Sequence, residues 1–450
     1  MKPVSLSKII IGLIFVYLIV TTANLQQYRQ SVIRWDVVSY YAYLPAAFIY
    51  NDLKLEYAAK PEFTGSVWHL RTEDGTPIIK TTMGLAILYS PFFFIAHGLS
   101  LTLDGYDANG YTIIYSLFLI LSNFFYTIIG FVFLRKLLLK YFNDKITAFV
   151  ILSVFFSTNL LFYTLFEVMA HSYLFAFINM LLYYIIEWHN KPKTKYSILI
   201  GLLFGIIILT RPTHILLILL FMLYNVYSIE TLKNKVELFI SNWRSLIIMA
   251  IFGFLVLSIQ FVYWKYISGS WLYWSYTGES FFWTKPHIVE GLFGFRKGWY
   301  LYMPIMLPAT IGLFLMKKID KKWSLVLPFF WMLFTYIILC WWSWWYGGGF
   351  SIRPYIDIYG IMGLGLGAFI KITLESIQSK KIRELIIAIL IIFSFYGAFT
   401  SFQYYQGAIH HDSMTRESWK DTFLKTHPAG TYWEDLKSPD YEKAIKTGEE

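Results

Sequence analysis

Apolar runs of roughly 17–22 residues, the length of a helix that crosses the hydrocarbon core, recur along the whole chain. The first run, from Ile9 to Val20, follows Lys2 and Lys8 and is expected to be an uncleaved anchor rather than a signal peptide, because many runs follow it. Further spans are expected near 111–133, 146–162, 172–188, 197–210, 213–228, 245–265, 299–316, 324–341, 355–373 and 384–402. The pattern predicts an all-α polytopic membrane protein with about 11 transmembrane helices.

Lysines and arginines gather in five short segments between these runs, and the positive-inside rule places such segments in the cytoplasm with the N-terminus. They are Arg135/Lys136/Lys140/Lys145, Lys191/Lys193/Lys195, Lys233/Lys235/Arg244, Lys317/Lys318/Lys321/Lys322 and Lys371/Lys380/Lys381/Arg383. Consecutive basic loops must then be separated by an even number of spans. The run Met83 to Leu103 breaks this parity if it crosses, so we expect a helix that lies along the outer face or dips into it. The prediction is a transmembrane domain over 1–402, with a first outer loop at 24–110 that carries surface helices, and an extracytoplasmic tail at 403–450.

The composition excludes several classes of protein. Of the 450 residues, 57% are hydrophobic and 15% are charged, and a soluble domain of this size cannot hide so much apolar surface. The net charge of +10 does not indicate nucleic-acid binding, because the basic residues lie in the short loops. The single cysteine, Cys340, excludes a disulfide within the chain and makes a thiolate metal site implausible.

Charged residues stand at the predicted outer ends of the apolar runs. Asp36, before an aromatic stretch that includes Tyr40, is a candidate general base toward an acceptor hydroxyl, or else a helix N-cap. Lys80 is a candidate ligand of a lipid phosphate, or a snorkelling lysine. Arg211 lies between two apolar runs, where it needs water or an anionic partner, so it is a candidate phosphate clamp or a structural partner of Glu167 or Asp36.

Two groups of residues suggest metal or sugar binding. Glu167 and His171 are four residues apart and would share a helical face, where they could bind a divalent metal, orient a sugar or form a hydrogen-bonded pair. His410, His411 and Asp412 open the tail and are a weaker candidate for a metal site.

Two outer loops combine glycines, aromatic residues and cations. The segment 266–299 contains Glu279, Arg296 and Lys297 among aromatic residues that could contact a ligand or form an interfacial belt. In the segment 341–355, four tryptophans occur in five positions, followed by Tyr346, three consecutive glycines and Arg353, whose guanidinium suits a bidentate bond to phosphate. Trp342, Trp345 and Tyr346 are expected to frame a bound group.

Together these features resemble the GT-C superfamily of membrane glycosyltransferases, including the dolichyl-phosphate-mannose-protein mannosyltransferases and aminoarabinose transferases. The resemblance implies a GT-C-like helical bundle, with Asp36 and Glu167 in the catalytic role and Lys80, Arg211, Arg353 and Arg296 binding the donor phosphate. It further implies that Tyr40, His171, Glu279, Trp342, Trp345 and Tyr346 contact substrate. Asp36 is followed by Val37 rather than by the second acid of the protein mannosyltransferases, which puts metal dependence in doubt. No cofactor is therefore assigned, and a divalent metal stays an open option.

The expected function is inverting transfer of a hexose or pentose from a polyprenyl-phosphate donor to an extracytoplasmic acceptor, which is a protein, a lipid or a polysaccharide. The expected location is the bacterial inner membrane, with membrane lipid and no nucleic acid as partners. A flippase or transporter of lipid-linked glycans, a polysaccharide polymerase or ligase, and a scaffold without chemistry are the alternatives. The sugar, the acceptor and the oligomeric state are not specified by the residues.

Overall fold

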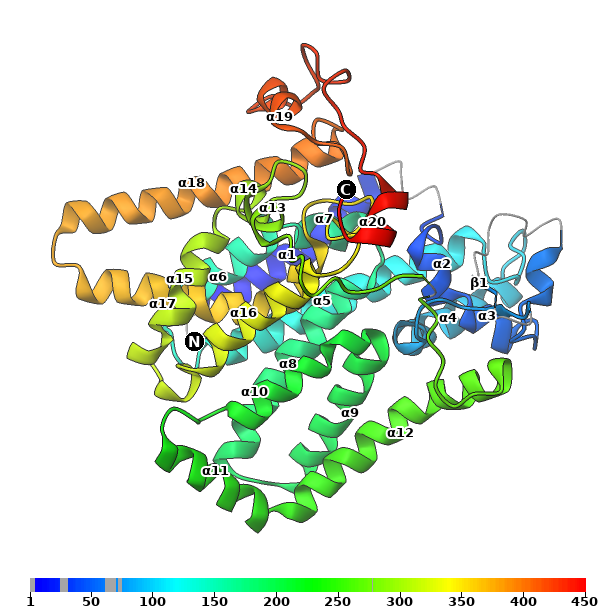
Figure 1. Cartoon of the computed structure of the whole chain (residues 1–450), viewed down its shortest axis with the longest axis horizontal. Helices are drawn as coiled ribbons and strands as arrows, with labels where there is room; N and C mark the ends of the chain where they lie inside the picture. Colours follow the sequence, from blue (N-terminus) through cyan, green and yellow to red (C-terminus); the bar gives the residue numbers. More distant parts are fainter. Residues whose placement is uncertain (1–4, 25–30, 61–69, 72–74, 277) are drawn as a thin grey trace.

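The computed structural model describes residues 5–24, 31–60, 70–71, 75–276 and 278–450 (Figure 1). The described chain is mostly helical, as the pattern of apolar runs predicts. Two short strands, β1 (Leu70–Arg71) and β2 (Pro77–Ile78), pair antiparallel within the first loop. The parts of that loop at 25–30, 61–69 and 72–74 lie outside the described residues. Lys2, which precedes the first apolar run, lies outside them as well.

The α-helices in chain order are α1 (Leu6–Asn24), α2 (Asp36–Tyr41), α3 (Tyr43–Phe48), α4 (Gly84–Thr102), α5 (Ile113–Leu138), α6 (Asp144–Phe156), α7 (Leu160–Phe166), α8 (Ala170–Asn190), α9 (Thr194–Thr210), α10 (Ile218–Leu223), α11 (Ile229–Ser241), α12 (Trp243–Ser268), α13 (Ile288–Phe293), α14 (Trp299–Tyr302), α15 (Met306–Leu315), α16 (Val326–Leu339), α17 (Tyr359–Ser376), α18 (Lys380–Tyr405), α19 (Arg416–Thr422) and α20 (Tyr441–Thr447). The 3₁₀ helices are η2 (Glu56–Ala59), η4 (Pro212–Leu217), η5 (Met316–Lys318), η6 (Lys321–Trp323) and η7 (Arg353–Ile358).

Six described helices are long and apolar enough to cross a membrane, and the bent pair α6 and α7, which meet at 57°, would make a seventh. The six are α4, α5, α12, η6 with α16, η7 with α17, and α18. Shorter apolar helices cover Leu6–Thr22, Thr194–Thr210 and Pro212–Leu223. These helices support an integral membrane protein, whereas the count of 11 spans stays a prediction.

Polar caps begin several helices. Asn143 accepts a hydrogen bond of 3.0 Å from the backbone N–H of Ile146 at the start of α6, and Ser379 accepts one of 3.4 Å from Ile382 at the start of α18. Ser228 forms a capping box with Thr231 at the start of α11. Because each cap satisfies a backbone N–H that has no partner within the helix, these short polar residues set where the helices begin.

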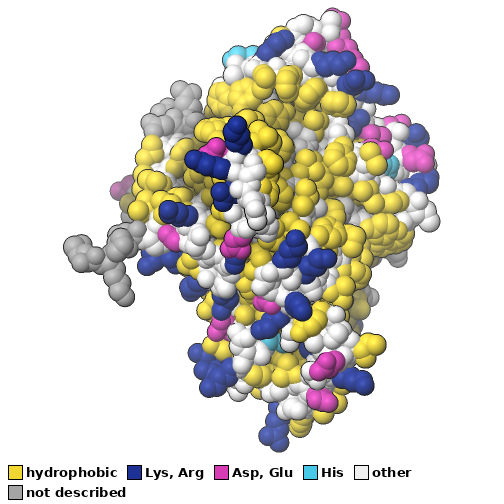
Figure 2. All heavy atoms as spheres, turned by 90° about the vertical axis from the view of Figure 1, so that its left-hand side faces the viewer, with side chains coloured by type: hydrophobic (Ala, Val, Ile, Leu, Met, Phe, Trp, Pro, Cys, Tyr) yellow, Lys and Arg dark blue, Asp and Glu magenta, His cyan; other side chains and the backbone are white. Residues whose placement is uncertain are grey.

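The basic loops meet at one end of the bundle, which we call the basic end. Figure 2 looks onto this end, the left-hand side of Figure 1, and shows lysine and arginine side chains scattered over it. Contacts join the loops there: Arg135 to Ser5 and Ser7, Lys140 to Glu187, Trp323 to Tyr141, Lys371 to the Tyr141 carbonyl, and the Asn225 N–H to the Lys322 carbonyl. Segments far apart in sequence therefore share the side that their charge predicts.

Helix α4 has the length of a span, yet both its ends contact the opposite end of the bundle. Gly84 packs on the end of α9, so closely that a Cβ there would lie 2.4 Å from the Thr210 nitrogen. Thirteen residues later, within α4, His97 Nδ1 lies 2.7 Å from the hydroxyl of Tyr115, near the start of α5. Between these two contacts, Phe92 packs on Phe125 and Tyr126 in α5. The prediction that α4 lies along the outer face or dips into it stays a prediction.

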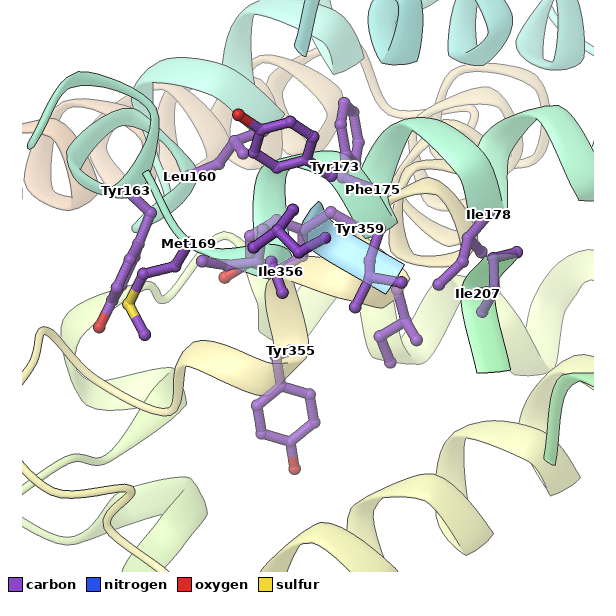
Figure 3. Close-up of a cluster of buried hydrophobic side chains, with 14 of the residues drawn as sticks. Leu160, Tyr163, Met169, Tyr173, Phe175, Ile178, Ile207, Tyr355, Ile356 and Tyr359 are labelled. Carbon is purple, nitrogen blue, oxygen red and sulfur yellow. The ribbon is translucent and has the colours of Figure 1, made fainter. Parts of the chain in front are cut away.

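A buried aromatic cluster supports the start of η7. Tyr355 and Trp299 stack with ring centroids 3.8 Å apart, and the Tyr359 hydroxyl donates a bond of 2.5 Å to Asn159. Figure 3 shows Ile356 of η7 beside Met169, which directly precedes α8, while the Tyr355 ring points away from Met169 and Tyr163. The core therefore fixes the backbone that carries Arg353.

Candidate functional site

A cavity of about 530 Å³ lies at the end opposite the basic end and draws its walls from six separated parts of the chain. Its charged and aromatic lining includes Asp36, Tyr40, Lys80, Arg211, His214, Tyr276, Glu279, Trp341, Trp342, Tyr346, Arg353 and Tyr441. The sequence-predicted residues Asp36, Lys80, Arg211 and Arg353 thus face one space, although up to 317 positions separate them. We call this space the cationic cavity.

An ion pair joins Asp36 and Arg353, the first and the last of the predicted site residues along the chain. Arg353, the first residue of η7, donates from Nη2 to Asp36 Oδ2 at 2.9 Å, and 44% of the Asp36 side chain is exposed against 16% for Arg353. Asp36 is the first residue of α2 and does not cap it, because the cap position is Trp35, which adopts a left-handed φ of 51°. The capping interpretation of Asp36 is therefore wrong, and its carboxylate is directed to Arg353.

A second ion pair lies on the opposite wall. Lys80 pairs with Glu279, whose other carboxylate oxygen accepts a bond of 3.0 Å from the indole N–H of Trp342. The Lys80 ammonium also lies 5.1 Å from the centre of the Tyr276 ring. Since Lys80 and Glu279 are both largely shielded from solvent, the lysine belongs to the cavity wall rather than snorkelling at the surface.

Arg211 ends α9 and contacts a histidine rather than a carboxylate. Its Nη2 lies 3.2 Å from His171 Nε2, while His171 Nδ1 lies 2.8 Å from Asp357 Oδ1. Asp357 Oδ2 lies 3.0 Å from Nε2 of His214, which also lines the cavity. The predicted pairing of Arg211 with Glu167 or Asp36 is therefore wrong, because the imidazole of His171 lies between the arginine and its nearest acid.

Tyr40 lies beside Arg211, as its predicted role in substrate contact requires. Burial raises the pKa of its hydroxyl, an effect opposed by Arg211 and Arg353. The hydroxyl is therefore a neutral hydrogen-bonding group at physiological pH, available to an oxygen-rich ligand.

Asp357 and His214 were not selected from the sequence as site residues. Asp357 follows Arg353 within the apolar segment Arg353–Ser376, which is long and hydrophobic enough to span a membrane. An ionisable residue in such a segment is expensive unless it has a partner or a function, and that cost was the available signal.

Four residues predicted to act in catalysis or binding do not line the cationic cavity: Glu167, which is described below, His171, Trp345 and Arg296. His171 is fully buried behind Arg211, and Trp345 is fully buried with its indole N–H 3.3 Å from the Tyr441 hydroxyl. Arg296 binds the tail instead, with Nη2 2.8 Å from the Glu450 carboxylate and Nη1 3.0 Å from the Lys437 carbonyl. The tail folds back onto this end of the bundle and so takes up the arginine predicted to bind phosphate.

The glycine-rich turn bends the backbone beside the cavity. Tyr346 and Gly347 adopt left-handed φ angles of 57° and 63°. At Gly349 a Cβ would lie 2.5 Å from the Tyr163 hydroxyl, which accepts a bond of 3.1 Å from the backbone N–H of Phe350. The glycines therefore allow the close approach that carries the chain from Trp342 to Arg353.

A second cavity of about 520 Å³ meets the first at the Asp36–Arg353 pair. Both cavities also share Tyr346, Gly347 and Tyr441. The second one adds two acids, Glu167 and Asp412, together with His411, so we call it the acidic cavity.

Glu167 lies on the wall of the acidic cavity, apart from His171. Burial raises the pKa of its carboxyl, against the opposing effects of Arg353 and Arg34. The prediction that Glu167 and His171 share a helical face is wrong, because α7 ends at Phe166 and α8 begins at Ala170.

The tail residues His410, His411 and Asp412 have ligand atoms that all lie within 4.8 Å of one another. Burial alone would raise the pKa of Asp412, but bonds from His410, Ser413 and Tyr441 hold it below its usual value. His410 Nδ1 lies 3.1 Å from the Ser413 backbone nitrogen and 3.3 Å from Asp412 Oδ1, so this nitrogen would have to give up these contacts to ligate a metal. The group offers nitrogen and carboxylate ligands, with His410 already committed to the turn.

An apolar groove of about 540 Å³ lies beside the cationic cavity, between α3, α4 and α12. Its walls are formed by Tyr43, Leu44, Ala47, Phe48, Leu53, Met83, Ala86, Ile87, Ser90, Phe94, Ile259, Val262, Tyr263 and Tyr266. Tyr43 links the two spaces, because its hydroxyl donates a bond of 2.6 Å to the carbonyl of Thr81, which lines the cationic cavity.

The chain matches no protein-family model and no curated protein. The cationic cavity thus places two carboxylates, three cations and several aromatic rings next to an apolar groove.

Proposed function

We propose that this chain is an integral membrane glycosyltransferase of the GT-C type, which moves a sugar from a polyprenyl-phosphate donor to an extracytoplasmic acceptor. The observation that carries the proposal is the convergence of Asp36, Lys80, Arg211 and Arg353 on one cavity beside an apolar groove. The three cations and the carboxylates of Asp36 and Glu279 leave the lining one net positive charge. A phosphodiester, with its single negative charge, complements that lining.

The apolar groove supports a lipid-linked donor. Its lining is apolar or aromatic apart from Ser90, so it suits a prenyl chain better than a sugar or a peptide. Because Lys80 lies only three residues before the groove residue Met83, a phosphate near Lys80 would lie close to the mouth of the groove. A single prenyl phosphate can thus occupy both spaces.

In the proposed reaction, Asp36 takes the proton of an acceptor hydroxyl that enters from the acidic cavity. The hydroxyl oxygen bonds to the anomeric carbon as the bond from that carbon to the phosphate oxygen breaks. Arg211, Lys80 and Arg353 stabilise the negative charge on the departing prenyl phosphate. Attack opposite the leaving group inverts the anomeric configuration, and Trp342 and Tyr346 frame the sugar.

The orientation forms part of the proposal. The positive-inside rule assigns the basic end to the cytoplasm of a bacterial inner membrane. Both cavities and the tail then face the extracytoplasmic side, with the N-terminus in the cytoplasm.

The test is sugar transfer by the purified chain in lipid nanodiscs, with a panel of labelled polyprenyl-phosphate sugars. Asp36→Asn should lower kcat by at least about 100-fold, the usual contribution of a general base. Lys80→Ala should raise KM for the donor, because it removes a charge that meets the phosphate. Lys136→Ala, at the basic end, is the control and should behave like the wild type. Full activity in both site variants would remove the mechanism, and glycan flipping without transfer would favour the transporter.

A further inference from the structure

Asp357 is the centre of a buried group behind the cationic cavity. Its two carboxylate oxygens lie 2.8 Å from His171 Nδ1 and 3.0 Å from His214 Nε2. Asp357 and His171 are fully buried, and His214 is 2% exposed. The three residues come from η7, α8 and η4, so the chain brings them together from three separate elements.

The donors and acceptors around His171 determine which of its nitrogens carries a proton. A guanidinium can only donate, so Arg211 Nη2, at 3.2 Å, requires a lone pair on His171 Nε2. The proton of a neutral imidazole must then sit on Nδ1, where it is donated to Asp357 at 2.8 Å. Asp357 thereby selects the tautomer of His171 that accepts from Arg211.

The nearest partner of Arg211 differs in charge from the partners of the other two cations of the cavity. Lys80 and Arg353 each contact a carboxylate, which offsets much of their charge at close range. Arg211 contacts a neutral ring, and the nearest acid of the group, Asp357, lies behind that ring. Its guanidinium is thus held in place by a hydrogen bond while its charge remains available to an anion.

We propose that Asp357 and His171 are positioning residues that hold Arg211 as the principal anchor for the phosphate of the donor. The inference rests on the donor class of the proposed function. It adds which of the three cations is the principal phosphate ligand and which residues position that cation. His214 Nε2 lies 3.0 Å from the second oxygen of Asp357, while the first oxygen is the one bonded to His171.

The test measures the Kd of farnesyl phosphate for the full chain in detergent by titration calorimetry. Asp357→Asn should weaken binding by about 10-fold or more, the effect expected for losing a hydrogen bond to a charged group. Asp320→Asn is the matched control, since this carboxylate caps η6 at the basic end and should leave Kd unchanged. Equal Kd values for Asp357→Asn and the wild type would overturn the proposal.

A double-mutant cycle separates positioning from a general loss of stability. A glutamine oxygen can take the place of His171 Nε2 and accept from Arg211 without selection of a tautomer. His171→Gln should therefore keep Kd within about 3-fold, and Asp357→Asn added to it should cost little more. If Asp357→Asn weakens binding by the same factor in both backgrounds, Asp357 does not act through His171.

The outcome for the wild type separates the two proposals. Tight binding of farnesyl phosphate without sugar transfer from any donor would leave the positioning role standing and reject the transferase. A wild type that does not bind the phosphate probe would overturn the anchor and the donor site together.

Discussion

At the scale of the residue, the charges at the ends of apolar runs proved to be informative. Asp36, Lys80, Arg211 and Arg353 could be selected from the sequence because a charge beside hydrocarbon needs a partner or water. Their actual partners could not be read, since each pair joins residues from distant segments. The histidine between Arg211 and Asp357 is an example, because the sequence gives no sign that α8 and η7 meet there.

Glu167 offers a prediction on pH and stability. Burial raises its folded-state pKa above the unfolded value, so the folded chain binds the extra proton and loses stability as pH rises between the two values. Glu167→Gln should therefore raise the melting temperature at neutral pH, on the order of 2 °C. Below the ordinary pKa of a glutamate the difference should vanish. Thermal unfolding in detergent from pH 4 to pH 8 measures it, and an unchanged difference across that range would contradict the assignment.

At the scale of the element, the apolar runs predicted that the chain is helical and roughly where each long helix lies. The breaks within runs were harder to predict. The chain turns between Phe166 and Ala170 without a proline or glycine, and this turn separates Glu167 from the helix that carries His171. The apolar sequence there favours a continuous helix, but tertiary packing overrides this preference. Tertiary packing cannot be predicted from the period of the apolar residues.

The contact between α15 and α17 carries a prediction about helix packing. Gly312 lies so close to α17 that a Cβ would stand 1.7 Å from the Gly365 carbonyl oxygen. Gly312→Ala should force the helices apart and destabilise the chain by about 1–3 kcal/mol, the cost of overpacking a core. It should also weaken donor binding, because η7 with Arg353 leads directly into α17.

Thermal unfolding and the Kd for farnesyl phosphate measure both effects of Gly312→Ala. Gly98→Ala in α4 is the matched control, because a Cβ there meets nothing within 4 Å. If both variants unfold at the wild-type temperature, the close helix contact does not limit stability.

At the scale of the whole molecule, the separation of charge between the two ends follows from the basic loops. Both the shared location of those loops and the gathering of candidate site residues at the opposite end were expected from span parity. The fold of the tail was not, since its ion pair with Arg296 depends on a surface that forms only when the bundle does.

Cysteine labelling tests the proposed orientation. Trp35, beside the cavities, is 81% exposed, whereas Cys340 is buried and gives little background. In a Cys340→Ser chain, Trp35→Cys should react with a membrane-impermeant maleimide in intact spheroplasts. Lys318→Cys, at the basic end, should react only after permeabilisation. The reverse pattern would show that the chain has the opposite orientation in the membrane. Labelling of both cysteines in intact spheroplasts would contradict the placement of the two ends on opposite faces of the membrane.

The ion pair between Asp36 and Arg353 has a consequence for the order of events in the proposed reaction. Because both cavities touch it, a phosphate that recruits the guanidinium on one side unpairs the carboxylate for a hydroxyl on the other. Asp36 therefore becomes free to act as a base when the donor binds. An acceptor hydroxyl that enters before the donor therefore meets a carboxylate that is still paired with Arg353, so the donor has to bind first for transfer to begin.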